Sequence, residues 1–327
     1  MKRLLRGFVA LSMVLAMTGC GGSSSSSDDL SSKKIGVIQL MKHVALDKSY
    51  EGFKDVLVDA GVKEENIDYQ IAGDQSNCTT VADKLVNSDN DLIYAIATPA
   101  LQQAASATAD LPIVGCAVTD YESTKLVKSN EKPGGNVTGA SDLTPIEQQF
   151  DLLKELLPNA KKVGIMYCSS EDNSKIQGAI AEKAAKKLEL EYVTRTISDS
   201  NDIQSVVTQL TSNDGVDVIY IPTDNVLATY MSSVEAVASD AKIPVICGEE
   251  GMVKEGGFAT YGIDYYNLGK LAGKQALAIL KGEKTAAETP IEYLASEDCQ
   301  MVINLKVAKK CGIEINKEDY KDATFIE

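Results

Sequence analysis

The chain has 327 residues, a formal net charge of −15, one histidine and no tryptophan. Nucleic acid and anionic membrane surfaces repel a strongly acidic protein, so the charge argues against both as partners. Because His43 is the only histidine and no Cys-x-x-Cys pair occurs, a site with several histidine or paired cysteine ligands is excluded, and we expect no metal and no other cofactor.

The chain opens with a pattern typical of a secretory signal. Residues 1–7 carry three positive charges, and residues 8–17 form an apolar run that is too short to cross a bilayer. The run ends in Met17-Thr18-Gly19-Cys20, which resembles the lipobox of bacterial lipoproteins and implies lipidation of Cys20. An ordinary secretory signal with an incidental cysteine is the alternative. Loss of residues 1–19 would take the net charge to −18 and leave residues 20–32 as a Gly/Ser-rich tether. We therefore expect a lipid-anchored protein on the outer face of the cell membrane.

Strand and helix patterns alternate through residues 33–142. Apolar runs at 34–40, 67–72, 92–97 and 113–116 predict buried strands, each ending in polar residues. Asp47 is placed to cap the first helix, and Thr98 to cap a later one with Pro99 at its first position. The Gly- and Pro-rich residues 131–139 predict a loop at the exit from this region.

The same alternation continues in the second half. Strands are predicted at 163–167, 191–197, 217–221, 244–247 and 258–262, and helices at 146–157, 179–188, 202–210 and 267–280. A strand at 291–294 and a strand–helix at 301–308 follow, and the pattern alone does not fix their lobe. Cys116, Cys168 and Cys247 end apolar runs and are predicted to be small buried residues, although the compartment would permit a disulfide.

Two internal echoes indicate that the halves repeat one another. Asp91 and Tyr94 lie 126 residues before Asp217 and Tyr220, and KKIGVIQ at Lys33 resembles KKVGIMY 128 residues later. We therefore predict an α/β protein with two similar, doubly wound parallel-sheet lobes. Lobe one comprises residues 33–142 plus about 264–290, and lobe two comprises residues 143–263 plus about 291–327.

Ligands of such sheets bind beyond the carboxyl ends of the strands, so function is expected in a cleft between the lobes. The strand-end loops are rich in acids (including Glu249) and hydroxyls (including Thr223), while Arg195 is the single arginine after residue 19. Carboxylates can pair an ammonium group and helix N-termini can hold a carboxylate, which together favour a small zwitterion. The candidate ligand contacts are His43, Asp47, Asp74, Thr98, Pro99, Thr119, Asp120, Ser141, Asp142, Ser169, Ser170, Glu171, Asp224, Asn225, Glu250 and Tyr265.

Several of these residues have a purely structural alternative. Thr98 and Asp224 could act only as helix caps, and His43 could be a solvated loop residue. Asp142 could only brace the hinge. Of Tyr265 and its neighbour Tyr266, one could line the cleft while the other packs.

These motifs together resemble the solute-binding lipoproteins of ABC transporters, in the family that includes tryptophan-binding, TrpX-like proteins. The resemblance covers Lys33 to Asn316 and rests on the motifs HVALD at 43–47, ATPA at 97–100, GASD at 139–142, PTDN at 222–225, GEEG at 248–251, YGIDYY at 261–266 and VINL at 302–305. At 167–171 the chain has YCSSE, where the family commonly has Asn-Pro after the tyrosine.

The resemblance implies a type I periplasmic-binding fold that closes on an amino acid, aromatic in characterised relatives, and delivers it to a membrane permease. It implies a monomer and no catalysis. A ligand sensor that feeds a membrane receptor, a binder of a different small solute and an extracellular enzyme are the alternatives; no nucleophile or metal motif supports the enzyme.

Overall fold

The computed structural model describes residues 29–295 and 298–327. The predicted signal sequence, Cys20 and tether residues 20–28 lie outside the described residues, so the lipidation remains a prediction. The tether was expected to extend to residue 32, but Leu30 is already buried against the core of lobe one. Over the described ranges, no helix is both long and apolar enough to cross a membrane.

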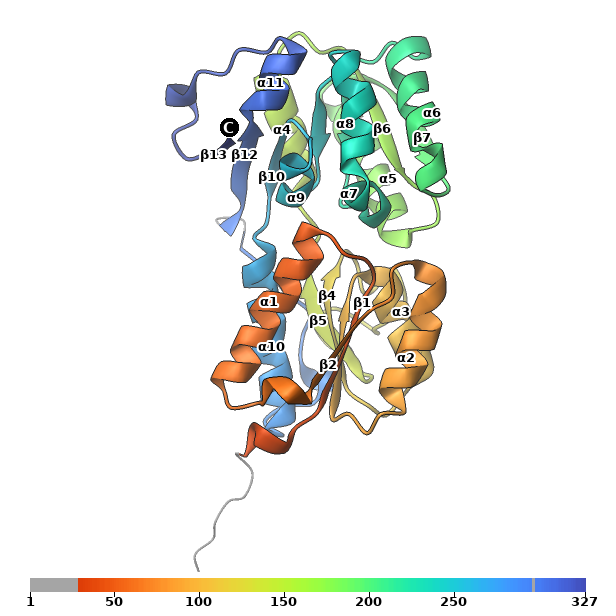
Figure 1. Ribbon diagram of the computed structural model, residues 1–327, viewed down its shortest axis with the longest axis vertical. Coiled ribbons are helices and arrows are strands. Elements are labelled where there is room, and N and C mark those ends of the chain that lie inside the picture. Colours follow the sequence, from red (N-terminus) through yellow and green to blue (C-terminus); the bar gives the residue numbers. More distant parts are fainter. Residues whose placement is uncertain (1–28, 296–297) are drawn as a thin grey trace, which may run out of the picture.

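The protein consists of two α/β lobes stacked end to end (Figure 1). The sheet of lobe one is entirely parallel, in the order β11-β5-β4-β3-β1-β2. Its strands are β1 (Ile35–Gln39), β2 (Ile67–Ile71), β3 (Leu92–Ile96), β4 (Ile113–Val118), β5 (Val137–Ser141) and β11 (Glu292–Tyr293). Its helices are α1 (Val44–Asp59), α2 (Cys78–Val86), α3 (Thr98–Ala107) and α10 (Tyr265–Leu280).

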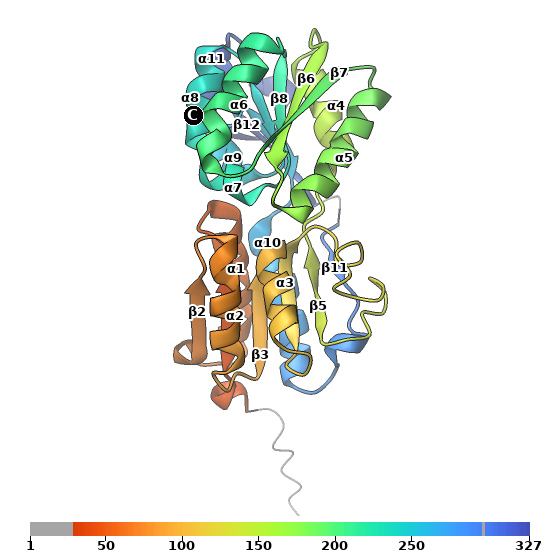
Figure 2. The same cartoon turned by 90° about the vertical axis from the view of Figure 1, so that its right-hand side faces the viewer.

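The sheet of lobe two runs β13-β12-β10-β9-β8-β6-β7, and only the β10–β12 pair is antiparallel. Its strands are β6 (Lys162–Cys168), β7 (Glu191–Ile197), β8 (Val218–Ile221), β9 (Val245–Cys247), β10 (Ala259–Gly262), β12 (Gln300–Asn304) and β13 (Thr324–Ile326). Its helices are α4 (Ile146–Leu156), α5 (Asp172–Lys187), α6 (Ile203–Thr208), α7 (Asn225–Thr229), α8 (Met231–Asp240), α9 (Glu250–Lys254) and α11 (Leu305–Cys311), and Figure 2 shows α5 and α6 on different sides of this sheet.

The internal repeat is confirmed by topology. The order β5-β4-β3-β1-β2 in lobe one has the same form as β10-β9-β8-β6-β7 in lobe two. Tyr94 on β3 and Tyr220 on β8 are both fully buried, and each stacks or tilts against a phenylalanine of its own lobe. The echoed tyrosines therefore hold equivalent core positions.

One lobe boundary and one strand differ from the sequence expectation. The strand β11 pairs with β5, which places Glu292 and Tyr293 in lobe one, after the boundary expected near residue 290. The segment from residue 137 to 141, expected partly as loop, is the buried strand β5. The later segment 301–308, which the pattern left unassigned, forms β12 and most of α11 in lobe two.

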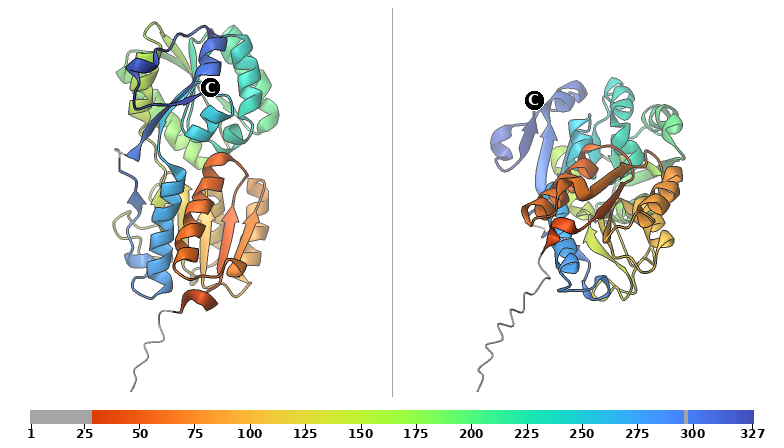
Figure 3. Two further views of the ribbon diagram at one scale, coloured as in Figure 1. Left: turned by 60° about the vertical axis from the view of Figure 1, so that its left-hand side comes forward. Right: turned by 60° about the horizontal axis from the view of Figure 1, so that its bottom comes forward.

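The helices α1 and α10 lie side by side along lobe one, although more than 200 residues separate them (Figure 3, left). Glycines allow this close contact. A Cβ atom on Gly52 would lie 2.0 Å from the carbonyl oxygen of Tyr266, and one on Gly269 would lie 2.1 Å from that of Ser49. Since α10 follows directly after the crossing from β10 of lobe two, this packing fixes one hinge segment to lobe one.

Candidate ligand-binding site

The loops that follow the strands of both lobes meet at one cavity. Lobe one contributes residues after β1, β4 and β5, and lobe two contributes residues after β6, β8 and β9, which matches the rule that ligands lie beyond the carboxyl ends of parallel strands. Its volume is about 10 Å³, room for little more than one water molecule, so side chains or lobes must move apart to admit a solute of amino-acid size. The cavity is lined by His43, Ala45, Leu46, Ala117, Thr119, Asp142, Asn173, Thr223, Asp224, Asn225, Ala228, Glu249 and Tyr265.

The ring of His43 joins the lobes through a hydrogen-bonded network. Its Nε2 lies 3.2 Å from Oδ1 of Asn225, and the Asn225 Nδ2 donates to Oε2 of Glu171 at 2.8 Å. Asn173 Nδ2 donates to the same oxygen at 2.9 Å, as does the backbone N–H of Asn225 at 3.2 Å. Two polar atoms of this network, His43 Nδ1 and Asn173 Oδ1, are buried without a hydrogen-bond partner. Unpartnered buried polar atoms beside a cavity are where a ligand is expected to bind.

A second network is centred on Asp142 at the hinge. Tyr265 donates its hydroxyl to Oδ2 of Asp142 at 2.9 Å, and Thr119 donates to Oδ1 at 3.4 Å. From lobe two, Gln177 donates to the Thr119 hydroxyl at 3.1 Å and to the Thr223 hydroxyl at 2.6 Å. Burial raises the pKa of Asp142 to about 6, against the opposing effect of its two hydroxyl donors. Gln177 therefore bridges the lobes directly beside a carboxyl group whose pKa is raised by burial.

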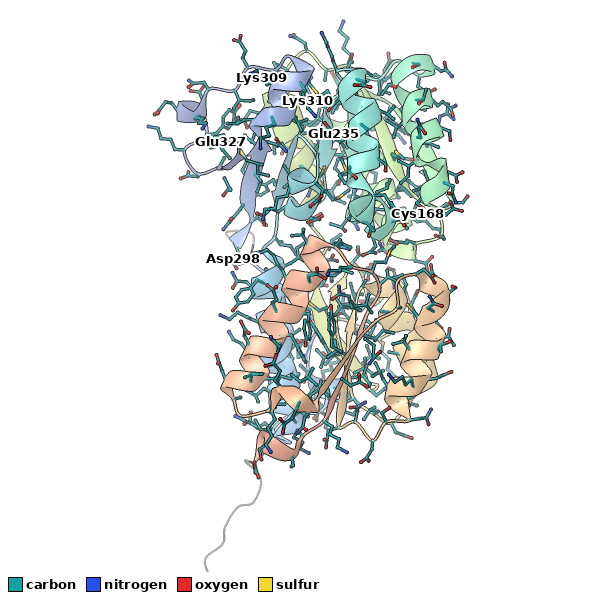
Figure 4. All side chains as sticks on the ribbon, viewed as in Figure 1. Cys168, Glu235, Asp298, Lys309, Lys310 and Glu327 are labelled. Carbon is teal, nitrogen blue, oxygen red and sulfur yellow. The ribbon has the colours of Figure 1, made fainter. Side chains whose placement is uncertain are left out.

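Two further carboxyl groups cap helices that point at the cavity. Asp224 accepts from the backbone N–H of Leu227, as the cap of α7, and from that of Cys168 at 2.6 Å. Cys168 lies at the edge of lobe two that faces lobe one (Figure 4). Glu249 accepts from the backbone N–H groups of α9, and burial raises its pKa to about 7.

The four buried acids of the site are Asp142, Glu171, Asp224 and Glu249, and burial raises the pKa of each. Burial also raises the pKa values of Asp224 and of Glu171, the latter to about 7, with repulsion from Asp224 as the second cause for Glu171. In residues 29–295 and 298–327 no ion pair includes any of the four, whereas the surface carries pairs such as Glu235–Lys310, labelled in Figure 4. Buried carboxylates without a counter-ion are costly, and a cationic ligand group would offset that cost.

Backbone strain occurs at two strand ends of lobe one, and Ala117 at one of them lines the cavity. Ala97 after β3 has φ 84° and Ala117 at the end of β4 has φ 55°. A positive φ costs an alanine on the order of 1 kcal/mol, and such strain gathers at binding sites because the surrounding fold holds it in place.

The structure separates the predicted contacts into three groups. Six line the cavity: His43, Thr119, Asp142, Asp224, Asn225 and Tyr265. Three line a larger groove of about 710 Å³ between the lobes: Asp74, Ser170 and Glu171. The others lie outside both: Asp47, Thr98, Pro99, Asp120, Ser141, Ser169 and Glu250.

The contacts of the outlying residues explain their positions. Ser141 donates to the Thr119 carbonyl, Ser169 to the Ile197 carbonyl, and Glu250 pairs with Lys254. Asp120 accepts from the backbone N–H groups of the turn that follows it.

Two expected caps are wrong. The helix α1 begins at Val44 after His43, so Asp47 lies in its first turn, where it accepts from Gln39. The helix α3 begins at Thr98 itself after Ala97, and the Thr98 hydroxyl is buried without a partner.

The sequence did not select four residues that the structure brings to the site: Asn173, Gln177, Thr223 and Glu249. Thr223 and Glu249 were visible among the strand-end hydroxyls and acids, but Asn173 and Gln177 lie one turn apart inside α5. Both are amide side chains on the helix face that packs toward the cavity. Sequence spacing shows that they share a face but not which way that face points.

Comparison with known proteins decides the family. A family model described as "ABC transporter substrate binding protein" matches residues 34–325. The chain belongs to this family. ABC substrate-binding proteins bind solutes outside the cytoplasm, and the two-lobed architecture is the type I periplasmic-binding fold that the sequence predicted.

Individual substrate-binding relatives cover nearly the whole chain. The tyrosine-binding protein of Clostridioides difficile (strain R20291) is 41% identical over 323 residues, which cover 95% of this chain and 91% of that protein. The structure of an ABC domain in complex with L-Trp from Streptococcus pneumonia is 41% identical, covers 90% of this chain and 99% of its own, and has a TM-score of 0.85.

A third relative distinguishes between lobe arrangements. The ligand-free, open structure of a substrate-binding protein with adhesive properties from Clostridium difficile is 37% identical with the same coverage, but its TM-score is 0.69. The two relatives are nearly equal in identity to the present chain. Its shape is nevertheless closer to the structure in complex with L-Trp than to the open, ligand-free structure. Together with the contacts between the lobes, this indicates a closed arrangement.

Proposed function

We propose that this protein is the extracytoplasmic binding component of an ABC importer for an aromatic amino acid, which it delivers to permease subunits in the membrane. The observation that carries the proposal is the cavity's set of buried carboxyl groups without a counter-ion. A ligand ammonium group would supply the missing positive charge and three N–H donors. The names of the two 41% identical relatives support an aromatic side chain.

Binding of both lobes to one ligand would favour the closed form. An amino acid that touches Asp142 in lobe one and Glu249 in lobe two gains both contacts only when the lobes are together. The population of the closed form then rises by as much as the ligand prefers it over the open one.

The test is calorimetric titration of the purified protein with each of the twenty amino acids. We expect binding of tyrosine, tryptophan or phenylalanine, and no binding of aliphatic amino acids at the same concentrations. If no aromatic amino acid binds, the proposal is overturned. Loss of labelled amino-acid uptake in cells that lack the protein supports import, and unchanged uptake contradicts it.

We further propose that Cys20 carries a lipid that anchors the protein to the membrane, and that the protein acts as a monomer. Mass spectrometry of the N-terminal peptide from membranes should give a mass increase at Cys20, and Cys20→Ser should release the protein into the medium. An unmodified Cys20 in membrane-derived protein would contradict the anchor. Light scattering of the purified protein tests the monomer.

A further inference from the structure

The hydrogen-bonding groups of the cavity restrict the class of ligand further. Two residues that line the cavity have a buried polar atom without a hydrogen-bond partner, His43 Nδ1 and Asn173 Oδ1, and each atom can be assigned as a donor or an acceptor from its neighbours. The assignment begins at Glu171, whose Oε2 atom receives N–H groups from Asn225 and Asn173. An oxygen that accepts several N–H groups remains an acceptor in either protonation state of the carboxyl group, because a proton would reside on the other oxygen.

Glu171 fixes the orientation of both amides. Because Asn225 must turn its Nδ2 toward Glu171, its Oδ1 faces His43. A carbonyl oxygen can only accept, so His43 Nε2 carries the hydrogen, and Nδ1 of a neutral ring is left as a lone pair. The same reasoning turns Asn173 Nδ2 toward Glu171 and leaves its Oδ1 as an acceptor. Burial lowers the pKa of His43 to about 4, which keeps the ring neutral near pH 7.

We infer that His43 Nδ1 is a specificity-determining acceptor, positioned through Asn225 by Glu171, and that it selects aromatic amino acids whose side chain carries a hydrogen-bond donor. This inference rests on the proposed function. The ammonium group satisfies the carboxyl groups and Asn173, and a phenol O–H or an indole N–H satisfies His43. Tyrosine and tryptophan bring that donor, and phenylalanine does not.

The expected size of the preference follows from the cost of an unpaired buried acceptor. Leaving such a group without a partner corresponds to roughly a 10- to 100-fold loss of affinity. A site built to hydrogen-bond a hydroxyl rejects the analogue without it far more strongly than an apolar pocket rejects an added hydroxyl. Tyrosine should therefore bind at least 10-fold more tightly than phenylalanine.

Calorimetric titration with tyrosine, phenylalanine and O-methyltyrosine tests the inference. O-methyltyrosine keeps the oxygen but has no donor, so it should bind no better than phenylalanine. Equal affinity for tyrosine and phenylalanine would overturn the inference while leaving the proposed function intact. Absence of binding by any aromatic amino acid would instead overturn the proposed function itself.

The matched variants are His43→Phe and Lys42→Gln, the latter at the exposed neighbouring position. His43→Phe should reduce the ratio of tyrosine affinity to phenylalanine affinity to about one, whereas Lys42→Gln should keep the preference. A preference for tyrosine that survives in His43→Phe assigns the discrimination to another residue and overturns the inference.

Because His43 is the only histidine, the ¹⁵N spectrum of histidine-labelled protein reports on this ring without assignment. We expect hydrogen on Nε2 and none on Nδ1, with the Nδ1 signal shifting on tyrosine binding and not on phenylalanine binding. Hydrogen on Nδ1 would overturn the inference. Glu171→Ala should produce a mixture of tautomers and a smaller tyrosine preference; an unchanged tautomer and ratio would remove Glu171 from the positioning role.

Discussion

The substitution Glu249→Gln tests whether buried charge opposes closure of the lobes without ligand. Glu249 is 2% exposed, and its burial depends on both lobes, because the adjoining Gly251 packs on Val44 of α1. The difference between its ordinary pKa of 4.5 and about 7 corresponds to about 3 kcal/mol against the ionised form, or roughly 300-fold in the closing equilibrium above pH 7. Glutamine removes the charge and keeps one oxygen, so of the N–H groups of Gly251 and Met252, which donate to different oxygens of Glu249, one loses its acceptor.

The assay is small-angle X-ray scattering of ligand-free protein at pH 7.5, together with calorimetric titration of the amino acid. Glu249→Gln should be more compact than the unmodified protein and should bind the amino acid more weakly, because it has lost a partner for the ammonium group. Lowering the pH should compact the unmodified protein as well. The raised pKa means that Glu249 is protonated below about pH 7 in the closed form, so the cost of closure is absent below about pH 4.5 and grows as the pH rises toward 7.

The control is Glu250→Gln at the next position. Glu250 pairs with Lys254 and lies outside the cavity, and its charge is only a secondary cause of the raised pKa of Glu249, so its loss should alter the scattering and the affinity far less than Glu249→Gln does. The reasoning is refuted if Glu249→Gln and the unmodified protein have the same radius of gyration at pH 7.5 and the same affinity.

Three further predictions concern the lobe contacts, the helix packing and the histidine. Gln177→Leu removes the side chain that donates to both Thr119 and Thr223, and the loss of about 1 kcal/mol should weaken amino-acid binding about fivefold. Stopped-flow experiments should show mainly faster dissociation, and Gln204→Leu, at an exposed position of α6, should have no effect. Gly52→Ala should lower the free energy of unfolding by about 1–3 kcal/mol in urea denaturation, because its Cβ would meet the Tyr266 carbonyl, and Gly135→Ala, with open space around it, should not. His43 should titrate near pH 4 in the folded protein; because the unfolded chain takes up this proton near pH 6.5, the stability contributed by His43 should fall as the pH drops from about 6.5 to 4, and an NMR titration with a midpoint near 6.5 would contradict this.

Much of the fold was predictable because the apolar pattern and the strand-end residues are local in sequence. The echo between Tyr94 and Tyr220 predicted two equivalent lobes, and both residues occupy the same core position. The strand β5 was not predicted, because it directly follows Pro133, Gly134 and Gly135, and these residues favour a loop. Its identity as a buried strand comes from pairing with β4 and β11, which is a contact between distant segments.

The site was predictable only to the level of loops. The sequence selected Asp142, Asp224 and Tyr265, which line the cavity, because Asp224 follows a predicted strand and the other two lie beside expected crossings between the lobes. It could not place Asn173 and Gln177, because the direction of a helix face depends on how α5 packs. Asp47 and Thr98 show the opposite failure: both have good capping chemistry, but the backbone starts each helix elsewhere, and tertiary packing determines that start.

The electrostatics and the hydrogen-bond polarity of the cavity lead to one mechanism of discrimination. Carboxyl groups without a counter-ion make closure costly when nothing positive lies between the lobes, so an ammonium group shifts the population toward the closed form. Once the lobes close, Glu171 holds Asn225 and Asn173 in orientations that leave His43 Nδ1 and Asn173 Oδ1 as acceptors. A solute with the wrong charge therefore fails at closure, whereas one with the right charge and no side-chain donor closes the lobes but leaves His43 Nδ1 unpaired. The two failures are separable, because the first changes the compactness of the protein and the second changes only the affinity.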